Sequence, residues 1–243
     1  MVRLHLEHPL HPGQSVPLTP AQAHYLGNVM RLKPGDAFEG FDGATGAHAM
    51  TVEGLAKRGG TARVGERTAP QRNPPDLWLV FAPIKKARTD FIVEKATELG
   101  VARILPVQTA RTNADRIRQD RLQAHAVEAA EQCGGTYVPA VEALQPLGRL
   151  LDAWPPDRAL VFADEALSGD PDWRGEGEAA AALPPAPAAV LIGPEGGFAP
   201  EERLRIRAAP QAAPLALGPR ILRADTAAVA ALTLWQAARG DWR

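Results

Sequence analysis

Apolar and polar residues alternate at the start of the chain in the way that a half-buried β-strand requires. Val2, Leu4 and Leu6 are separated by more polar residues, so one face of this segment is expected in a core. The pair Asp42 and Gly43 lies between two further alternating segments and predicts the turn of a hairpin. Strands are expected at residues 38–41, 48–52 and 62–64. A small β-barrel is the simplest way to close them.

A short helix is expected within this region. Thr19 can cap its first free amides, and Pro20 suits its first turn because that position needs no amide hydrogen bond. Apolar residues at helical spacing follow until Pro34 and Gly35, which end the pattern. The N-terminal region therefore combines several short strands with one helix.

Two consecutive prolines mark a change in the pattern. Residues 71–75 read Gln-Arg-Asn-Pro-Pro, a segment that is stiff and cannot continue a sheet ladder. Continuous apolar runs then alternate with helical stretches, which is typical of a parallel α/β sheet. These runs cover residues 77–81, 104–107, 159–162 and 188–192. The pattern predicts two domains, residues 1–72 and residues 73–243.

Two helices are predicted early in the second domain. The first has Thr89 or Asp90 as its cap and ends at Gly100, and the second covers about residues 115–132. The apolar face of the first is expected to consist of Phe91, Ile92, Ala96 and Leu99. Residues 168–187 are rich in Ala, Pro and Gly and show little periodicity, which predicts a surface excursion without a chemical role.

Charge and composition narrow the possible functions. Hydrophobic residues make up 45% of the chain and charged residues 23%, which indicates a globular protein. A formal net charge of -1 argues against indiscriminate nucleic-acid binding, so any RNA contact must use local basic patches. Two candidate patches exist, for which a solvated charged face is the common alternative. They consist of Lys85, Lys86 and Arg88, and of Arg111, Arg116, Arg118 and Arg121.

Other classes of protein are excluded by what the sequence lacks. No secretory signal pattern or apolar run of membrane-spanning length is present, which predicts a cytoplasmic protein. The single cysteine, Cys133, excludes an internal disulfide and a cysteine-rich zinc site, and no structural metal is expected. Cys133 is expected to be a buried small residue, because no histidine lies nearby in sequence to activate it as a nucleophile.

The first candidate site is a glycine-rich junction. The apolar run that ends at Ile192 leads into Gly193, Pro194, Glu195, Gly196 and Gly197, and Pro200 with two glutamates then opens a helix. Strand-to-helix junctions of this kind bind ligands in open α/β sheets. The spacing fits neither a dinucleotide fingerprint nor a phosphate-binding P-loop. From the residues alone, a structural tight turn and a ligand loop remain even alternatives.

A second junction follows a strand expected near residues 215–217. Gly218 leads into a polar segment in which Arg220 and Arg223 stand close to a helix start at Asp225 or Thr226. Positive charge beside a helix N-terminus favours an anion such as an RNA phosphate. The helix that follows carries an apolar face that suits a core or a subunit interface. This face consists of Ala228, Leu232 and Trp235.

Four motifs of the second domain together resemble the RsmE family, the uridine N3-methyltransferases of 16S ribosomal RNA that belong to the SPOUT class. They read KATELGV (residues 95–101), EQCGG (131–135), VLIGPEGGF (190–198) and LGPRILRADTA (217–227). RLHLE at residues 3–7 and HYLGNVMRLKPGD at residues 24–36 resemble the PUA-like RNA-binding barrel of that family. The resemblance covers nearly the whole chain. It implies a PUA-like barrel followed by an α/β domain with a C-terminal trefoil knot.

The resemblance also implies a homodimer that uses S-adenosylmethionine (SAM) and acts on 16S rRNA of the small ribosomal subunit. The cofactor pocket would be lined by Glu165, Leu191, Gly193, Glu195, Gly196, Gly197, Leu217, Gly218, Ile221, Leu222 and Thr226. The residues expected to contact RNA are Arg3, Arg31, Lys85, Lys86 and Arg88. Many members read LRTET where this chain reads LRADT, so the acidic residue here is the shorter Asp225.

Direct transfer of the methyl group to uridine N3 is the expected reaction. Arg223 is expected to stabilise the N3 anion with help from Arg220, and Asp225 is a candidate proton acceptor that could equally be a helix cap. The target base must be unpaired, since a Watson–Crick pair occupies N3. Two alternatives stay open: a SPOUT enzyme that methylates another base or a ribose, and a non-catalytic RNA-binding assembly protein.

Overall fold

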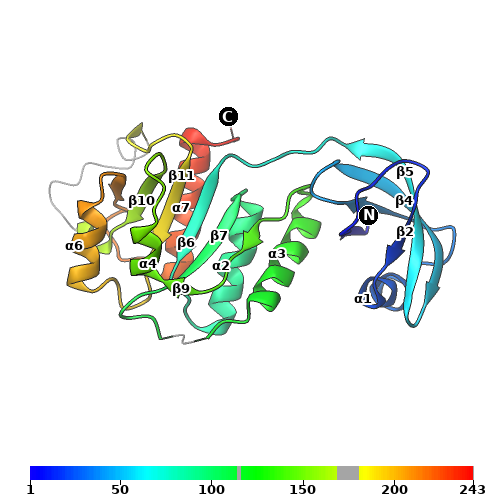
Figure 1. The fold of residues 1–243 in the computed structure, drawn as a ribbon, viewed down its shortest axis with the longest axis horizontal. Helices are drawn as coiled ribbons and strands as arrows, with labels where there is room; N and C mark the ends of the chain where they lie inside the picture. Colours follow the sequence, from blue (N-terminus) through cyan, green and yellow to red (C-terminus); the bar gives the residue numbers. More distant parts are fainter. Residues whose placement is uncertain (114–115, 169–180, 243) are drawn as a thin grey trace. The chain divides into compact units, whose positions relative to one another are not determined.

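The computed structural model describes residues 1–113, 116–168 and 181–242, and within them the chain forms two compact units (Figure 1). Unit 1 comprises Met1–Asn73 and Ala130–Val138, and unit 2 comprises Pro74–Ala129 and Pro139–Arg243. Helix α3 (Gln119–Cys133) begins in unit 2, and its last residues belong to unit 1. Each unit has its own β-sheet.

Unit 1 is built on a five-stranded mixed sheet. The strands are β1 (Arg3–His5), β2 (Ser15–Leu18), β3 (Ala37–Phe41), β4 (Ala47–Ala56) and β5 (Gly59–Ala69), in the order β1-β3-β4-β5-β2. β1 pairs in parallel with β3, and the other neighbours are antiparallel. Alternate residues such as Leu4, Leu6 and Phe38 are buried, as the sequence pattern predicts.

The predicted helix of unit 1 starts as expected and then changes its geometry. α1 (Pro20–His24) has Thr19 as its cap, and Thr19 and Gln22 form a reciprocal capping box. A π-helical turn, η1 (Tyr25–Val29), follows directly and buries Leu26 against the sheet core. No feature of the sequence pattern predicts this π-helical turn.

The turn between β3 and β4 depends on one carboxylate. Asp42 accepts hydrogen bonds from the backbone amides of Leu10, Ala44 and Thr45 and from the Thr45 hydroxyl, at 2.7–3.0 Å. Burial alone raises the pKa of Asp42, but these donors outweigh it and hold the pKa below its ordinary value. Gly43 adopts φ +77°, so the predicted Asp42-Gly43 turn is confirmed.

Unit 2 contains an all-parallel sheet with the strand order β12-β10-β11-β6-β7-β8, and β9 also pairs with β7. The strands are β6 (Leu77–Phe81), β7 (Arg103–Gln108), β8 (Ala140–Val141), β9 (Gln145–Pro146), β10 (Ala159–Ala163), β11 (Ala188–Ile192) and β12 (Ala212–Leu215). All five residues of β11 are buried, because helices cover both faces of a parallel sheet. The parallel α/β prediction is confirmed.

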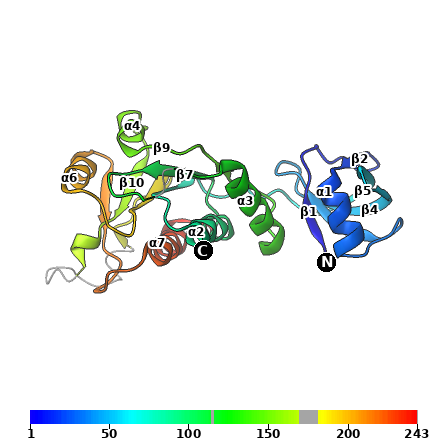
Figure 2. The ribbon, with the colours of Figure 1, turned by 90° about the horizontal axis from the view of Figure 1, so that it is seen from below.

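Helices flank this sheet on both sides (Figure 2). α4 (Leu147–Asp152) and α6 (Pro200–Ala208) lie on one face, and α2 (Lys86–Glu98) and α7 (Ala224–Arg239) lie on the other. The predicted face of α7 is buried, and the Trp235 indole donates to the Pro184 carbonyl at 3.0 Å. Within the described parts of the chain, none of the helices has the length and apolar character that crossing a membrane requires.

Helix boundaries differ from the sequence prediction in three places. α2 begins at Lys86, and Thr89 lies inside the helix, where its buried hydroxyl bonds to the backbone of Ile84. α3 begins at Gln119, while the expected start at residue 115 lies outside the described residues. α7 begins at Ala224 with Arg223 as its cap residue. Polar side chains suit both a cap and a first turn, so sequence alone misplaces the start.

Three smaller expectations also need correction. Phe91, expected on the buried face of α2, is 39% exposed, and Val93 is buried there in its place. Cys133 is exposed, because it lies at the last residue of α3. β12 ends at Leu215, before the strand end that was predicted at residue 217. Most of the predicted excursion at residues 168–187 lies outside the described residues.

Candidate active site

A cavity of about 320 Å³ opens in unit 2 where three neighbouring strands end. Its lining comes from residues 163–168 after β10, residues 192–197 at the end of β11, and residues 215–227 between β12 and α7. Parallel strands place their carboxyl ends at one edge of a sheet, where open α/β folds bind ligands. The volume lies at the lower end of the range for small-molecule pockets. Both predicted junctions therefore meet at a single cavity.

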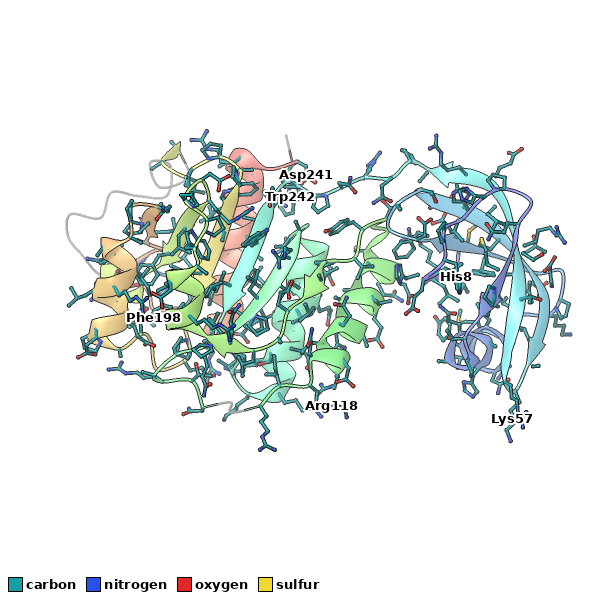
Figure 3. All side chains as sticks on the ribbon, in the orientation of Figure 1. His8, Lys57, Arg118, Phe198, Asp241 and Trp242 are labelled. Carbon is teal, nitrogen blue, oxygen red and sulfur yellow. The ribbon has the colours of Figure 1, made fainter. Side chains whose placement is uncertain are left out.

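The first wall of the cavity is the glycine loop, residues 193–197. A Cβ atom at Gly193 would lie 2.7 Å from the ring of Phe198. Phe198, labelled in Figure 3, is buried and packs edge-on against Phe162 with 5.2 Å between ring centroids. Gly197 has φ +67°, and a Cβ atom there would lie 2.2 Å from Oε1 of Glu165. Close packing and backbone conformation both require glycine in this loop.

Two contacts fix the glycine loop from the segment after β7. Arg111 donates from Nη1 to the carbonyl of Gly196 at 2.8 Å. Glu202, in the first turn of α6, accepts from the Ala110 amide at 2.8 Å and from the Ala199 amide at 3.1 Å. The loop and the helix that follows it are thereby held to the segment that follows β7.

A buried carboxylate lies between the cavity and α6. Asp164 follows β10, lines the cavity and has a fully buried side chain. It forms ion pairs with Arg203 at 3.0 Å and Arg207 at 2.5 Å, two residues one helical turn apart on α6. It also accepts from the Ala166 amide at 3.2 Å, next to Glu165. Sequence reasoning missed Asp164, although an acidic residue at the end of an apolar strand was a visible signal.

The second wall is the arginine segment, residues 217–223. Arg220 and Arg223 line the cavity and are exposed, and Ile221 is 75% exposed at the same rim. Among the described residues, neither arginine has an ion-pair or hydrogen-bond partner for its side chain. Gly218 is buried with φ +96°, yet no described atom beyond its two chain neighbours lies within 4 Å of where its Cβ would be. This wall therefore offers a ligand space and positive charge that is unpaired within the described parts of the chain.

Three charged residues connect the two walls with α2. Arg88 pairs with Glu195 at 2.8 Å between Nη1 and Oε1, and with Asp225 at 3.7 Å between Nε and Oδ2. Asp225 lies in the first turn of α7, and its Oδ1 accepts from the Thr226 amide at 2.9 Å. The expected cap residue is thus a first-turn residue that also faces an arginine.

Most of the predicted cofactor residues border the cavity. Those that line it are Glu165, Gly193, Glu195, Gly197, Leu217, Ile221 and Leu222. The predicted residues outside its lining are Leu191, Gly196, Gly218 and Thr226. Leu191 is fully buried in the core with Val80 and Phe162, because successive residues of a strand point to opposite faces. The side chain of Leu191 therefore packs in the core of unit 2.

The predicted RNA-binding residues fall into different environments. Lys85 and Lys86 are exposed at the start of α2, and Arg31 is exposed in unit 1 with φ +59°. Arg3 is engaged inside unit 1, where it pairs with Glu39 at 2.6 Å and donates to the carbonyls of Ala130, Glu131 and Gly135. With 14% of its side chain exposed, Arg3 is a structural residue of unit 1.

The pairing of Arg3 affects the pKa of its partner, Glu39. Burial raises the pKa of Glu39, but hydrogen bonds from Arg3 and Thr68 outweigh it, so the pKa lies below its ordinary value. Arg3 also lies 5.0 Å from the centroid of the Phe41 ring. These contacts leave the guanidinium little freedom to reach a phosphate.

The chemistry of the cavity suits a ligand that carries both apolar and positively charged parts. Ile192, Leu215 and Leu222 supply an apolar lining. The carboxylate of Glu165 faces the cavity and has no hydrogen-bond or ion-pair partner in the described chain. SAM has such a character, with an adenine ring and a sulfonium and an ammonium group. No cluster of three metal-ligating side chains occurs among the described residues.

Comparison with protein families gives two matches on this chain. The RNA methyltransferase domain matches residues 71–236, and the RNA methyltransferase PUA domain matches residues 18–64. The ribosomal RNA small subunit methyltransferase E of Synechocystis sp. is 34% identical over 90% of this chain and 71% of its own length. The protein of the same name from Mycobacterium tuberculosis is 29% identical over 90% of this chain and 88% of its own length.

Solved structures agree in fold along the whole chain. A ribosomal RNA small subunit methyltransferase E from Neisseria gonorrhoeae, bound to S-adenosyl methionine, has a TM-score of 0.86 at 30% identity and covers 100% of both chains. A methyltransferase from Legionella pneumophila in complex with SAM has a TM-score of 0.84 at 29% identity, over 99% of this chain and 98% of that one. The likeness therefore extends over both units.

Proposed function

Because this chain belongs to the ribosomal RNA small subunit methyltransferase E family, we propose that it transfers the methyl group of SAM to N3 of one uridine in 16S rRNA. The observation that carries this proposal is the cavity between the glycine loop and the arginine segment. One wall is fixed by several contacts, and the other presents two arginines without partners among the described residues. Such a site can hold a cofactor and receive an anionic RNA.

The cavity would hold SAM through both walls. SAM supplies a methyl group on a sulfonium, which is electrophilic enough to react without a covalent enzyme intermediate. Glu165 would face its positive charge, while Ile192, Leu217 and Leu222 would enclose its apolar parts. Gly193 and Gly197 have no side chains, so their backbone can pack closely against Phe198 and Glu165 while the cavity beside them stays open. The protein therefore contributes orientation and the exclusion of water.

Charged residues at the cavity rim would handle the uridine. Arg223 would stabilise the negative charge that develops on the base when N3 loses its proton, and Arg220 would assist it or hold a neighbouring phosphate. Asp225 lies in the first turn of α7, outside the cavity lining but between Ala224 and Ala227, which do line it. Its carboxylate would accept the proton from N3. The N3 lone pair then forms the new bond to carbon as the carbon–sulfur bond breaks, which leaves S-adenosylhomocysteine and 3-methyluridine.

The remaining features of the proposal concern RNA and assembly. Arg31 in unit 1 and Lys85 and Lys86 in unit 2 would contact phosphates and bring an unpaired uridine to the cavity. We further propose the trefoil knot and a homodimer, domain limits at residues 1–72 and 73–243, and activity in the cytoplasm, where small ribosomal subunits are made.

One assay tests this function. Purified protein is incubated with labelled SAM and small ribosomal subunits from cells that lack the enzyme, and the modified nucleoside is identified by mass spectrometry. The expected result is 3-methyluridine at one position of 16S rRNA. A different methylated nucleoside would replace the substrate assignment with another base or a ribose. No methylation of subunits or of free 16S rRNA, despite SAM binding, would contradict the proposal and favour an assembly protein.

A further inference from the structure

Arg88 differs from the other basic residues at the start of α2. Lys85 and Lys86 are exposed, whereas the side chain of Arg88 is 30% exposed and directed at two carboxylates. Its Nη1 lies 2.8 Å from Glu195 and its Nε lies 3.7 Å from Asp225. Glu195 belongs to the glycine loop and Asp225 to the helix that follows the arginine segment. One guanidinium therefore joins three elements that are far apart in sequence.

A phosphate contact would require Arg88 to leave this arrangement. The two carboxylates face the same guanidinium, so its departure would leave two negative charges close together without compensation. An incoming phosphate would add a third negative charge beside them. Lys85 and Lys86 can meet a phosphate without this cost, because they have no ion-pair partners among the described residues. A phosphate contact is therefore costly for Arg88 but not for Lys85 and Lys86.

We propose that Arg88 is a positioning residue of the methyl-transfer site, one that holds Glu195 against the cavity and Asp225 in place for proton transfer. This inference rests on the proposed function for its reaction step. The planar guanidinium suits the task, because it presents several donors in fixed directions and can serve two carboxylates at once. Lysine, with a single charged atom, can satisfy only part of this arrangement. Arg88 acts through Glu195 and Asp225 and contacts neither the methyl group nor the base.

The test separates binding of SAM, binding of RNA and turnover in the full-length protein. Arg88→Ala is expected to weaken SAM binding in calorimetry and to lower kcat by about tenfold to a hundredfold, since small misplacements of reacting groups have such effects. KM for RNA and its salt dependence should stay close to wild type. Arg88→Lys should restore part of the loss. Combining Arg88→Ala with Glu195→Gln should cost less than the product of the two single effects, because both remove the same contact.

A matched control removes an ion pair elsewhere on unit 2. Arg205 pairs with Asp152 at 2.5 Å on the surface, and Arg205→Ala is expected to change none of these quantities. If Arg88→Ala folds poorly in a thermal melt, Arg88→Gln takes its place, because it keeps a donor without the charge. Each variant is therefore compared at equal folded fraction.

One pattern would overturn the inference. If Arg88 were a phosphate contact, its removal would raise KM for RNA and lower the slope of log affinity against log salt by about 0.7–0.9, with SAM binding and kcat intact. The SAM titration needs no RNA, so it tests whether Arg88 positions Glu195 even if the true RNA substrate differs from the one proposed. If wild type methylates another nucleoside, the function proposal fails, and the same kinetic comparison on that substrate still decides the role of Arg88.

Discussion

The glycine loop and the arginine segment face the same cavity but are held in different ways. The glycine loop is fixed by Arg111 at Gly196, by Arg88 at Glu195 and by the ring of Phe198 at Gly193. The side chains of the arginine segment, residues 217–223, form no hydrogen bond or ion pair with another described residue. The glycine loop is therefore preorganised, while the arginine segment presents donors that have no partner within the described parts of the chain.

This difference indicates a division of work within the site. A cofactor of constant shape gains from a rigid wall, because little ordering remains to be done when it binds. RNA brings negative charge that varies in position, and arginines without partners among the described residues can adjust to it. The fixed residues should therefore affect stability, SAM binding and the position of the reacting groups, whereas Arg220 and Arg223 should act directly on RNA binding and on the base. The following changes test that comparison.

Arg223→Ala, a change in the arginine segment, should have the largest effect on turnover. Loss of a donor that stabilises a developing anion typically lowers kcat by about 10²–10³-fold. The thermal unfolding temperature and SAM affinity should stay near wild type, because Arg223 has no side-chain partner among the described residues. Single-turnover kinetics with saturating SAM measures the change. Arg223→Lys, which keeps the charge, should retain more activity; equal loss in both variants would argue against an electrostatic role.

Asp164→Ala tests the ion pairs that hold α6 next to the cavity. Breaking a buried ion pair costs about 3–5 kcal/mol, and we expect the lower end, because Arg203 and Arg207 are 31% and 37% exposed and can return to water. Urea unfolding of the full chain, followed through unit 2, measures the loss. A variant as stable as wild type would show that the ion pairs are not what fixes α6.

Asp42→Asn extends the comparison to an anchored turn of unit 1 that lies in no proposed site. Four donors bond to the carboxylate, so about 1–3 kcal/mol of stability should be lost at neutral pH. The pKa of Asp42 is lowered on folding, so its contribution to stability is complete above the ordinary value of 3.8 and is lost as pH falls through the lower pKa of the folded state. Unfolding at pH 7 and at a series of pH values below 3.8 measures this, and a gap in stability between variant and wild type that does not narrow along the series would contradict it.

Arg220→Ala should have the smallest effect. If Arg220 holds a phosphate, RNA affinity falls modestly and the slope of log affinity against log salt drops by about 0.7–0.9, while kcat at saturating RNA changes little. Filter binding across a salt series provides the measurement. An unchanged slope with a large loss of kcat would instead assign Arg220 to the stabilisation of the base.

Sequence patterns predicted the elements that depend on local chemistry. The runs at 77–81 and 188–192 match β6 and β11 residue for residue, because continuous apolar stretches between prolines and glycines leave little choice. The start of α7 was misplaced, because Asp225 serves a helix as well in the first turn as at the cap. Local signals therefore fix the existence of an element better than its ends.

The contacts that define the site depend on residues far apart in the chain. Arg88 and Glu195 are 107 residues apart, and Asp164 is separated from Arg203 and Arg207 by 39 and 43 residues. Arg3 finds its carbonyl partners 127–132 residues away, so its engagement inside unit 1 is not predictable from the sequence around it. The glycine and arginine motifs are recognisable in the sequence. The sequence does not reveal which charged side chains pair with one another in the fold.

A calorimetric titration of SAM tests whether the cavity between the glycine loop and the arginine segment is the cofactor site. Wild type should bind one SAM per chain, and Gly197→Ala should bind at least about tenfold more weakly, since φ +67° strains alanine and its methyl group would displace Glu165. Gly13→Ala, with φ +85° and open space around it, is the matched control for backbone strain and should bind like wild type. No binding to wild type, or equal binding to Gly197→Ala, would contradict the assignment.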